Sequence, residues 1–181
     1  MNQSQSKKNN AYVIRKPTAS DAQAIIHYSK LLFSSTDQVL TLPEEYKISI
    51  EDEKTWINTF NANPNALALV AETAGNIIGF LFFIPHPKKK VAHTGEFGVS
   101  VDPQFQKQGI GKALVDALLI WAVANPVIEK VFLNVFASNT HAIKLYHKLG
   151  FKEEGRFVRA VKQPDGAYVD VLQMYVLTKS N

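Results

Sequence analysis

The stretch VSVDPQFQKQGIGKAL, residues 99–114, passes from an apolar strand through a glycine-spaced turn into an apolar helix. Glycines allow the backbone to curl close to an anion, and the first N–H groups of a helix point outward toward it. The helix dipole adds partial positive charge at the same place. The stretch therefore predicts a phosphate site made mainly of backbone groups, with Lys107 and Lys112 adding formal charge on either side.

Two familiar phosphate motifs do not fit this turn. A P-loop would need its first glycine at Gln106 and its hydroxyl residue at Ala113. A dinucleotide-binding fingerprint would need a third glycine where the chain has Leu114. The pattern that remains is Gln106-x-x-Gly109-x-Gly111, and it predicts a pyrophosphate cradle that needs no metal ion.

The elements on either side of the turn predict one mixed α/β domain. Strands are expected over 11–17, 66–73, 77–85, 93–103, 127–138, 151–163 and 167–177, and helices over 22–35, 51–60, 108–124 and 140–149. Short connections between them leave no room for a second domain. We expect a single domain over residues 11–178, with a mixed, mostly antiparallel sheet flanked by helices on both faces, and a disordered tail over residues 1–10.

Composition narrows the classes of function. Apolar residues make up 46% of the chain and charged residues 20%, which is ordinary for a globular protein. The absence of cysteine excludes a thiolate nucleophile and cysteine-ligated zinc in this chain. A net charge of +4 would suit nucleic acid, but the one dense basic run, Lys88 to Lys90, is typical of a solvated loop. The polar N-terminus and the lack of a long apolar run predict a cytoplasmic protein with no nucleic-acid or membrane partner.

A second motif follows about thirty residues after the glycine turn. It is Asn139-x-x-Ala142-x-x-Leu145-Tyr146-x-x-x-Gly150-Phe151, with Asn139 where a helix N-cap belongs and Gly150 where a C-terminal glycine belongs. Together the two motifs resemble the GNAT superfamily of N-acetyltransferases, whose acyl-CoA loop reads [Gln/Arg]-x-x-Gly-x-[Gly/Ala]. The likeness extends from Tyr12 to Leu177, and its later parts resemble bacterial small-amine, amino-acid or ribosomal-protein acetyltransferases.

The resemblance implies a site for acetyl-CoA as co-substrate, with no metal. It assigns cofactor contacts to Val99, Val101, Gln106, Lys107, Gln108, Gly109, Ile110, Gly111, Lys112, Asn139, Ala142 and Tyr146. It also implies that the sheet splays beside the 93–103 strand. The pantetheine arm would then pair with the backbone of Val99 and Val101, and an N–H near Val99 would stabilise the oxyanion.

Tyr146 is the first candidate catalytic residue. A tyrosine at helical spacing is often only a packed core residue, but the resemblance implies that this one reaches the CoA sulfur. A thiol has a pKa of ~8.5 and a phenol ~10, so complete proton donation to the thiolate is uphill by ~2 kcal/mol. We therefore expect Tyr146 to hydrogen-bond the leaving sulfur.

The acceptor amine also needs a base, because at neutral pH nearly all of a primary amine is protonated. Glu96, on the strand that leads to Val99, is the candidate, and water or His93 are the alternatives. Some GNAT proteins carry a glutamate in the next strand, where this chain has Asn134. An exposed strand carboxylate is the simpler interpretation of Glu96.

The acceptor itself has no readable signature, since residues 30–60 and 155–170 contain no known motif. Asn134, Tyr168 and Asp170 are candidate substrate-binding residues. The Asp170 carboxylate on the closing strand would attract an ammonium group, and an ordinary edge-strand charge is the simpler interpretation. We expect acetyl transfer by direct attack in a ternary complex, with a small amine, an amino acid or a protein N-terminus as acceptor. A non-catalytic acyl-CoA-binding module is the alternative, and a homodimer remains open.

Overall fold

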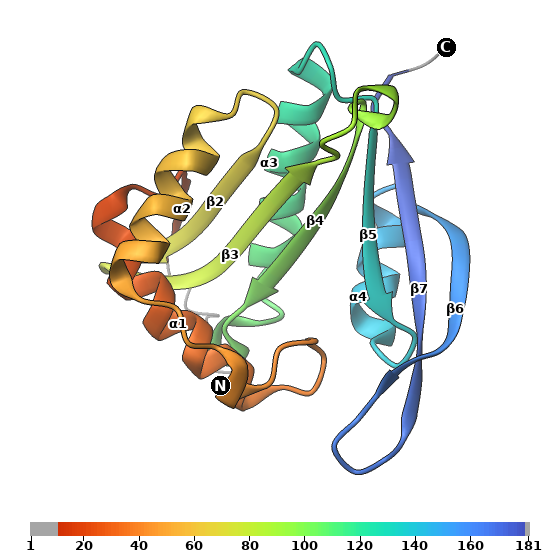
Figure 1. Ribbon diagram of the computed structural model, residues 1–181, viewed down its shortest axis with the longest axis horizontal. Coiled ribbons are helices and arrows are strands. Elements are labelled where there is room, and N and C mark those ends of the chain that lie inside the picture. Colours follow the sequence, from red (N-terminus) through yellow and green to blue (C-terminus); the bar gives the residue numbers. More distant parts are fainter. Residues whose placement is uncertain (1–10, 180–181) are drawn as a thin grey trace, which may run out of the picture.

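A computed structural model describes residues 11–179, so the tail predicted over residues 1–10 lies outside the described part. One seven-stranded sheet runs through the molecule in the order β1-β2-β3-β4-β5-β7-β6 (Figure 1). Its strands are β1 Val13–Arg15, β2 Leu67–Thr73, β3 Asn76–Pro85, β4 Thr94–Val101, β5 Lys130–Phe136, β6 Lys152–Lys162 and β7 Tyr168–Leu177. The α-helices are α1 Ala22–Ser35, α2 Ile50–Ala62, α3 Ile110–Ala124 and α4 Thr140–Lys148. The α/β fold expected from the sequence is confirmed.

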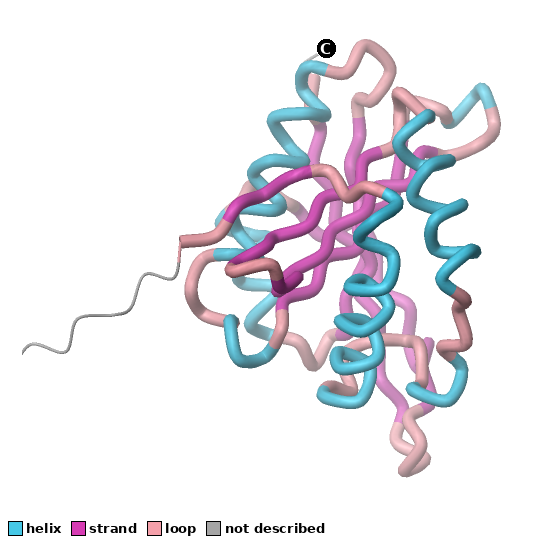
Figure 2. The backbone as a smooth tube through the Cα atoms, turned by 90° about the vertical axis from the view of Figure 1, so that its left-hand side faces the viewer, coloured by secondary structure: helices cyan, strands magenta, loops and turns pink. Residues whose placement is uncertain are grey.

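Helices cover both faces of the sheet, as expected (Figure 2). On one face α1 and α2 enclose a cluster that contains Ile25, Ile57 and Val70. On the other face α3 and α4 pack against a larger cluster that contains Leu114 and Tyr146. Alternate residues of a strand point to opposite faces of the sheet. Because helices cover both faces, the first five residues of β2 are all buried. No helix within residues 11–179 is both long and apolar enough to cross a membrane.

The turn residues explain where several elements begin and end. Ala74 and Gly75 have φ values of 47° and 78°, the left-handed pair that a tight β2–β3 hairpin requires. Asn139 caps α4, since its side chain accepts a hydrogen bond of 3.1 Å from the N–H of Ala142. Gly150, with φ at 89°, ends that helix as the sequence predicts.

The sheet opens at its centre, between β4 and β5. These two strands are parallel and pair only over Thr94–Glu96 and Lys130–Phe132. Beyond that point β4 stays with β3 and β5 stays with β7, so the two strands diverge (Figure 1). The splay that the family resemblance implied is present, and it leaves backbone groups in the middle of the sheet without a neighbouring strand.

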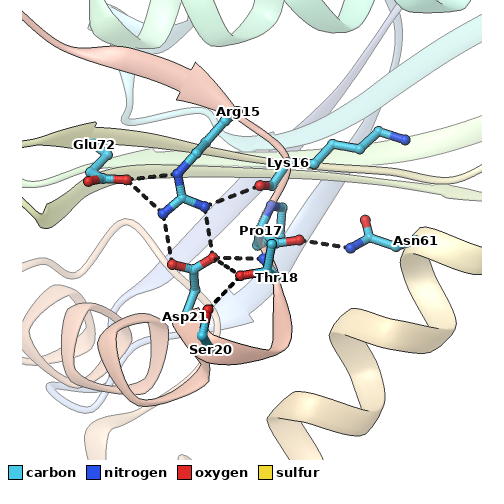
Figure 3. Close-up of polar contacts among 8 residues, drawn as sticks. All are labelled: Arg15, Lys16, Pro17, Thr18, Ser20, Asp21, Asn61 and Glu72. Atoms are coloured by element: carbon cyan, nitrogen blue, oxygen red, sulfur yellow. Dashed lines mark hydrogen bonds and ion pairs between the residues drawn. The ribbon is translucent and has the colours of Figure 1, made fainter.

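An ion cluster joins the start of the chain to the sheet (Figure 3). The Arg15 guanidinium on β1 donates two hydrogen bonds to the Asp21 carboxylate, at 2.8 and 2.7 Å, and one to Glu72 on β2 at 2.7 Å. The N–H of Thr18 donates a further bond of 2.7 Å to Asp21. Hydrogen bonding from Arg15 lowers the pKa of Asp21 to about 2.

Candidate active site

A cavity of about 690 Å³ lies where β4 and β5 diverge. Side chains from both faces of the sheet line it. Glu96, Asn134, Phe80 and Phe82 come from the face covered by α1 and α2, and Phe97, Val99, Leu133 and Tyr146 come from the opposite face. The cavity therefore reaches side chains of both faces of the sheet at the point where the two strands separate.

Backbone groups of β4 face this opening. At the two ends of β4, the backbone bonds of Thr94 and Asp102 go to the β3 side of the strand. Because successive residues direct their N–H and C=O groups to alternate sides, Phe97, Val99 and Val101 present theirs toward β5. β5 has already moved away at this level. Backbone groups without a neighbouring strand are the kind that pair with an added extended chain, so the pairing expected at Val99 and Val101 stays a prediction.

The glycine turn before α3 presents a row of N–H groups. Lys107 and Gly109 have φ values of 60° and 87°, so two residues of the loop adopt the left-handed conformation before the helix begins. The N–H groups of residues 107–112 donate to no acceptor in the described part of the chain. Such a concave row at the positive end of a helix fits a pyrophosphate. The cradle predicted from residues 106–112 is therefore compatible with this geometry.

The side chains of this loop are mostly occupied elsewhere. The Gln106 amide donates a bond of 3.2 Å to the C=O of Val101, and the Ile110 side chain is buried in the core. The amide of Gln108 donates to a backbone carbonyl of the same loop at 3.4 Å. Lys112 forms an ion pair of 2.6 Å with Asp116. These side chains have partners within the chain, and an anion site made chiefly of the loop's backbone stays a prediction.

Tyr146 enters the cavity from α4. Its ring packs edge-on against Phe97, with ring centroids 6.0 Å apart, and it also contacts Phe151. Its hydroxyl makes no hydrogen bond within residues 11–179. Burial raises the pKa of Tyr146 to about 12. The phenol is therefore a weaker acid than in water, which suits a hydrogen-bond donor better than a source of a proton.

Glu96 and Asn134 meet across the splay. The Asn134 side-chain amide on β5 donates a hydrogen bond of 2.8 Å to the Glu96 carboxylate on β4. Both side chains line the cavity and remain open to solvent. This bond holds the carboxylate at the opening. The sequence pointed to each residue separately, and the structure brings them together. His93, the alternative base, does not line the cavity.

The structure does not bring Tyr168 and Asp170 to the cavity. Asp170 on β7 accepts hydrogen bonds of 2.8 Å from the N–H of Arg159 and from the Arg156 side chain, and these lower its pKa. The Tyr168 ring lies 4.0 Å from the Arg159 guanidinium. Both residues belong to the outer β6–β7 hairpin, and Val171 is the β7 residue that reaches the cavity.

One group of cavity residues was not predicted. It is an aromatic wall made of Tyr28, Phe33, Tyr46, Trp56, Phe80 and Phe82, together with the carboxylate of Glu53. The sequence did show acidic residues at 51–53 and aromatic residues spaced along the 51–60 helix. Acidic residues are common in a first helical turn, so nothing distinguished Glu53 from its exposed neighbours.

A cavity where the sheet splays, together with a glycine turn that presents N–H groups before a helix, is the arrangement expected of the class of acyl-CoA-dependent acyltransferases. Residues 34–151 match the model of the acetyltransferase (GNAT) family. The chain belongs to this family: it is an acetyltransferase, and acetyl-CoA is its co-substrate. Within residues 11–179 no cluster of His, Cys, Asp or Glu could hold a metal ion.

Individual relatives agree with this assignment. The chain is 30% identical to an N-alpha-acetyltransferase of Sulfurisphaera tokodaii over 82% of its length and 85% of the relative's. It is 28% identical to the L-amino acid N-acetyltransferase AaaT of Escherichia coli, over 78% of this chain and 90% of that protein. A GNAT-family acetyltransferase structure from Streptococcus pneumoniae superposes with a TM-score of 0.89, at 24% identity, over 92% of this chain and 99% of that one.

Proposed function

We propose that this enzyme transfers the acetyl group of acetyl-CoA to a small primary amine that carries no carboxylate. The observation that carries the proposal is the charge of the cavity lining. Glu53, Asp52 and Glu96 contribute carboxylates, whereas no lysine, arginine or histidine of residues 11–179 lines it. An ammonium group is stabilised in such surroundings, and an unpaired carboxylate is repelled.

Donor and acceptor would approach from opposite faces. The N–H groups of residues 107–112 bind the pyrophosphate, and Val99 and Val101 hold the pantetheine arm along β4. Asn139, which also lines the cavity, is placed to contact the same arm while it caps α4. The acceptor enters on the side of Phe80 and Phe82. The two substrates meet in the splay, so transfer proceeds by direct attack in a ternary complex.

Three groups of the chain carry the chemistry. Glu96, held by Asn134, takes a proton from the acceptor ammonium, and the free amine then forms the new C–N bond. The N–H of Val99, which faces the opening, stabilises the negative charge that develops on the acetyl oxygen. As the C–S bond breaks, the nitrogen releases its second proton to solvent and becomes the amide nitrogen. The Tyr146 hydroxyl donates a hydrogen bond to the leaving thiolate, which then gains a proton from solvent.

The names of the relatives include two other kinds of acceptor, amino acids and N-terminal α-amines. An amino acid brings a carboxylate close to its reacting nitrogen, and the cavity of this chain offers no cationic side chain to pair with it. The aromatic wall instead favours an apolar body behind the amine. A small amine fits both properties.

A matched pair of acceptors tests this choice. 2-Phenylethylamine and L-phenylalanine differ by one carboxylate, so the enzyme is assayed with both, and with a peptide that has a free N-terminus, by following CoA release and acetyl-product mass. We expect kcat/KM for the amine to exceed that for the amino acid by about tenfold or more, because the carboxylate would stay unpaired. Preference for phenylalanine or the peptide would refute the proposal.

A further inference from the structure

Glu53 is a buried carboxylate for which the acetyl-transfer step provides no role. It lies in the first turns of α2 and is 8% exposed. Its carboxylate forms neither a hydrogen bond nor an ion pair within residues 11–179. It lines the cavity, and burial raises its pKa. Its oxygens keep only slight exposure, toward the cavity, and a carboxylate with so little solvation and no partner is stabilised by a cation, which points to a partner that arrives with a ligand.

Aromatic rings line the same cavity as this carboxylate. Trp56, one helical turn further along α2, packs against Phe80 with ring centroids 5.9 Å apart. Tyr46 packs against Phe33 with ring centroids 5.0 Å apart, and burial, with a smaller contribution from the charge of Glu53, raises the pKa of Tyr46. Rings that share a cavity with a carboxylate match an alkylammonium ion, since ring faces attract a cation and the carboxylate pairs with it.

Asp52 is hydrogen-bonded to Ser49, and the other two carboxylates of the cavity lie on different walls. Glu96 lies on β4 at the splay, where acetyl transfer takes place. Glu53 reaches the same cavity from the helix layer that covers the sheet. An acceptor bound between them meets one carboxylate near its reacting nitrogen and the other further along its body.

We propose that Glu53, Tyr46, Trp56 and Phe80 form a subsite for a second ammonium group of the acceptor, which makes α,ω-diamines the substrate class of this enzyme. The inference rests on the proposed function, because the first amine must still be acetylated beside Glu96. It also goes further, since an acceptor with a single ammonium group that binds beside Glu96 leaves the Glu53 carboxylate without a partner.

The test compares 1,5-diaminopentane with pentylamine, which has the same carbon chain and one ammonium group. Direct binding is followed by tryptophan fluorescence in a Trp121→Phe background, because Trp56 then remains as the only tryptophan. We expect the diamine to bind about tenfold tighter or more than pentylamine, and Glu53→Gln to abolish that difference. Glu51→Gln is the matched control, because Glu51 is exposed on the same helix and pairs with Lys54 at 2.8 Å.

Acetylation kinetics with the same two amines complete the test. Glu53→Gln is expected to raise KM for the diamine while KM for pentylamine stays within about twofold. Equal binding of the two amines to the parent protein, or an unchanged preference in Glu53→Gln, would overturn the subsite. If neither amine is acetylated but the diamine still binds through Glu53, the proposed function fails and the subsite stands. Thermal unfolding of each variant confirms that Gln, which has the same shape, leaves the fold intact.

Discussion

At the scale of single residues, Tyr146 is a phenol that burial has made less acidic. With its pKa near 12 and a thiol pKa of ~8.5, complete transfer of its proton to the leaving thiolate would cost about 5 kcal/mol. A hydrogen bond to the developing thiolate avoids that cost and becomes stronger as the charge forms. Its contribution is therefore made mainly in the transition state.

Tyr146→Phe removes this hydroxyl and keeps the ring that packs against Phe97 and Phe151. We expect kcat to fall by about ten- to a hundredfold, while the Kd for acetyl-CoA changes by less than about twofold. Steady-state kinetics and calorimetric titration of the donor measure the two quantities. Unchanged kcat would leave Tyr146 as a packing residue only.

Glu96 is the other residue whose role can be isolated. Glu96→Gln keeps a group that can bond Asn134 but cannot accept a proton, so we expect kcat/KM at pH 7 to fall by about a hundredfold. The deficit should shrink as pH rises toward ~10, because the acceptor amine then loses its proton to solvent. Activity is measured from pH 6.5 to 10 against the parent enzyme. A deficit that is independent of pH would contradict a role as base.

At the scale of elements, the turn before α3 requires glycine at position 109 because of its backbone conformation, and not because a side chain would lack space. A Cβ at Gly109 would meet no atom within 4 Å, but its φ of 87° lies where side chains are strained. We expect Gly109→Val to distort the loop of N–H groups and abolish measurable acetyl-CoA binding. Gly75→Val is the matched control, since Gly75 has a φ of 78°, equally open surroundings and a place in the β2–β3 turn. Acetyl-CoA affinity comparable to the parent's in Gly109→Val would refute the cradle.

Local chemistry accounts for the elements that could be predicted. The cap at Asn139 and the left-handed glycines at Gly109 and Gly150 are short-range signals, so the boundaries of α3 and α4 follow from a few neighbouring residues. The acceptor side depends on long-range contacts instead. Glu53 becomes a cavity residue because α2 folds over β3 and β4, and an acidic first turn looks the same whether it faces solvent or a cavity.

Tyr168 and Asp170 show the opposite effect. Their place on the closing strand was correctly anticipated, but whether a strand residue reaches a cavity depends on which partners it finds. Here Arg156 and Arg159 on β6 engage both side chains, and this pairing across the hairpin has no short-range signal. The conformation of the glycine loop was accordingly easier to predict than the set of cavity residues that α1, α2 and the sheet bring together.

At the scale of the whole molecule, the ion cluster of Arg15, Asp21 and Glu72 helps to fix α1, which carries part of the aromatic wall, against the sheet (Figure 3). This cluster ties β1 and the beginning of α1 to β2, and α1 carries Tyr28, whose hydroxyl donates a hydrogen bond of 2.9 Å to Ser100 on β4. The position of α1 over the cavity thus depends on contacts at both of its flanks. We therefore expect loss of the cluster to lower the free energy of unfolding of the whole domain.

Asp21 contributes this stability in a defined pH range. Its pKa is about 2 in the folded protein and 3.8 ordinarily, so the carboxylate favours the folded state above pH 4 and progressively loses that effect as pH falls toward 2. We expect Asp21→Asn to lower the free energy of unfolding by about 1–2 kcal/mol at pH 7, a value reduced for partial solvent exposure. Urea unfolding from pH 7 down to pH 2 measures the difference between variant and parent, which should narrow below pH 4. Glu44→Gln, an exposed carboxylate, should show no such narrowing. A constant difference at every pH would show that Asp21 stabilises the fold through packing rather than through its charge.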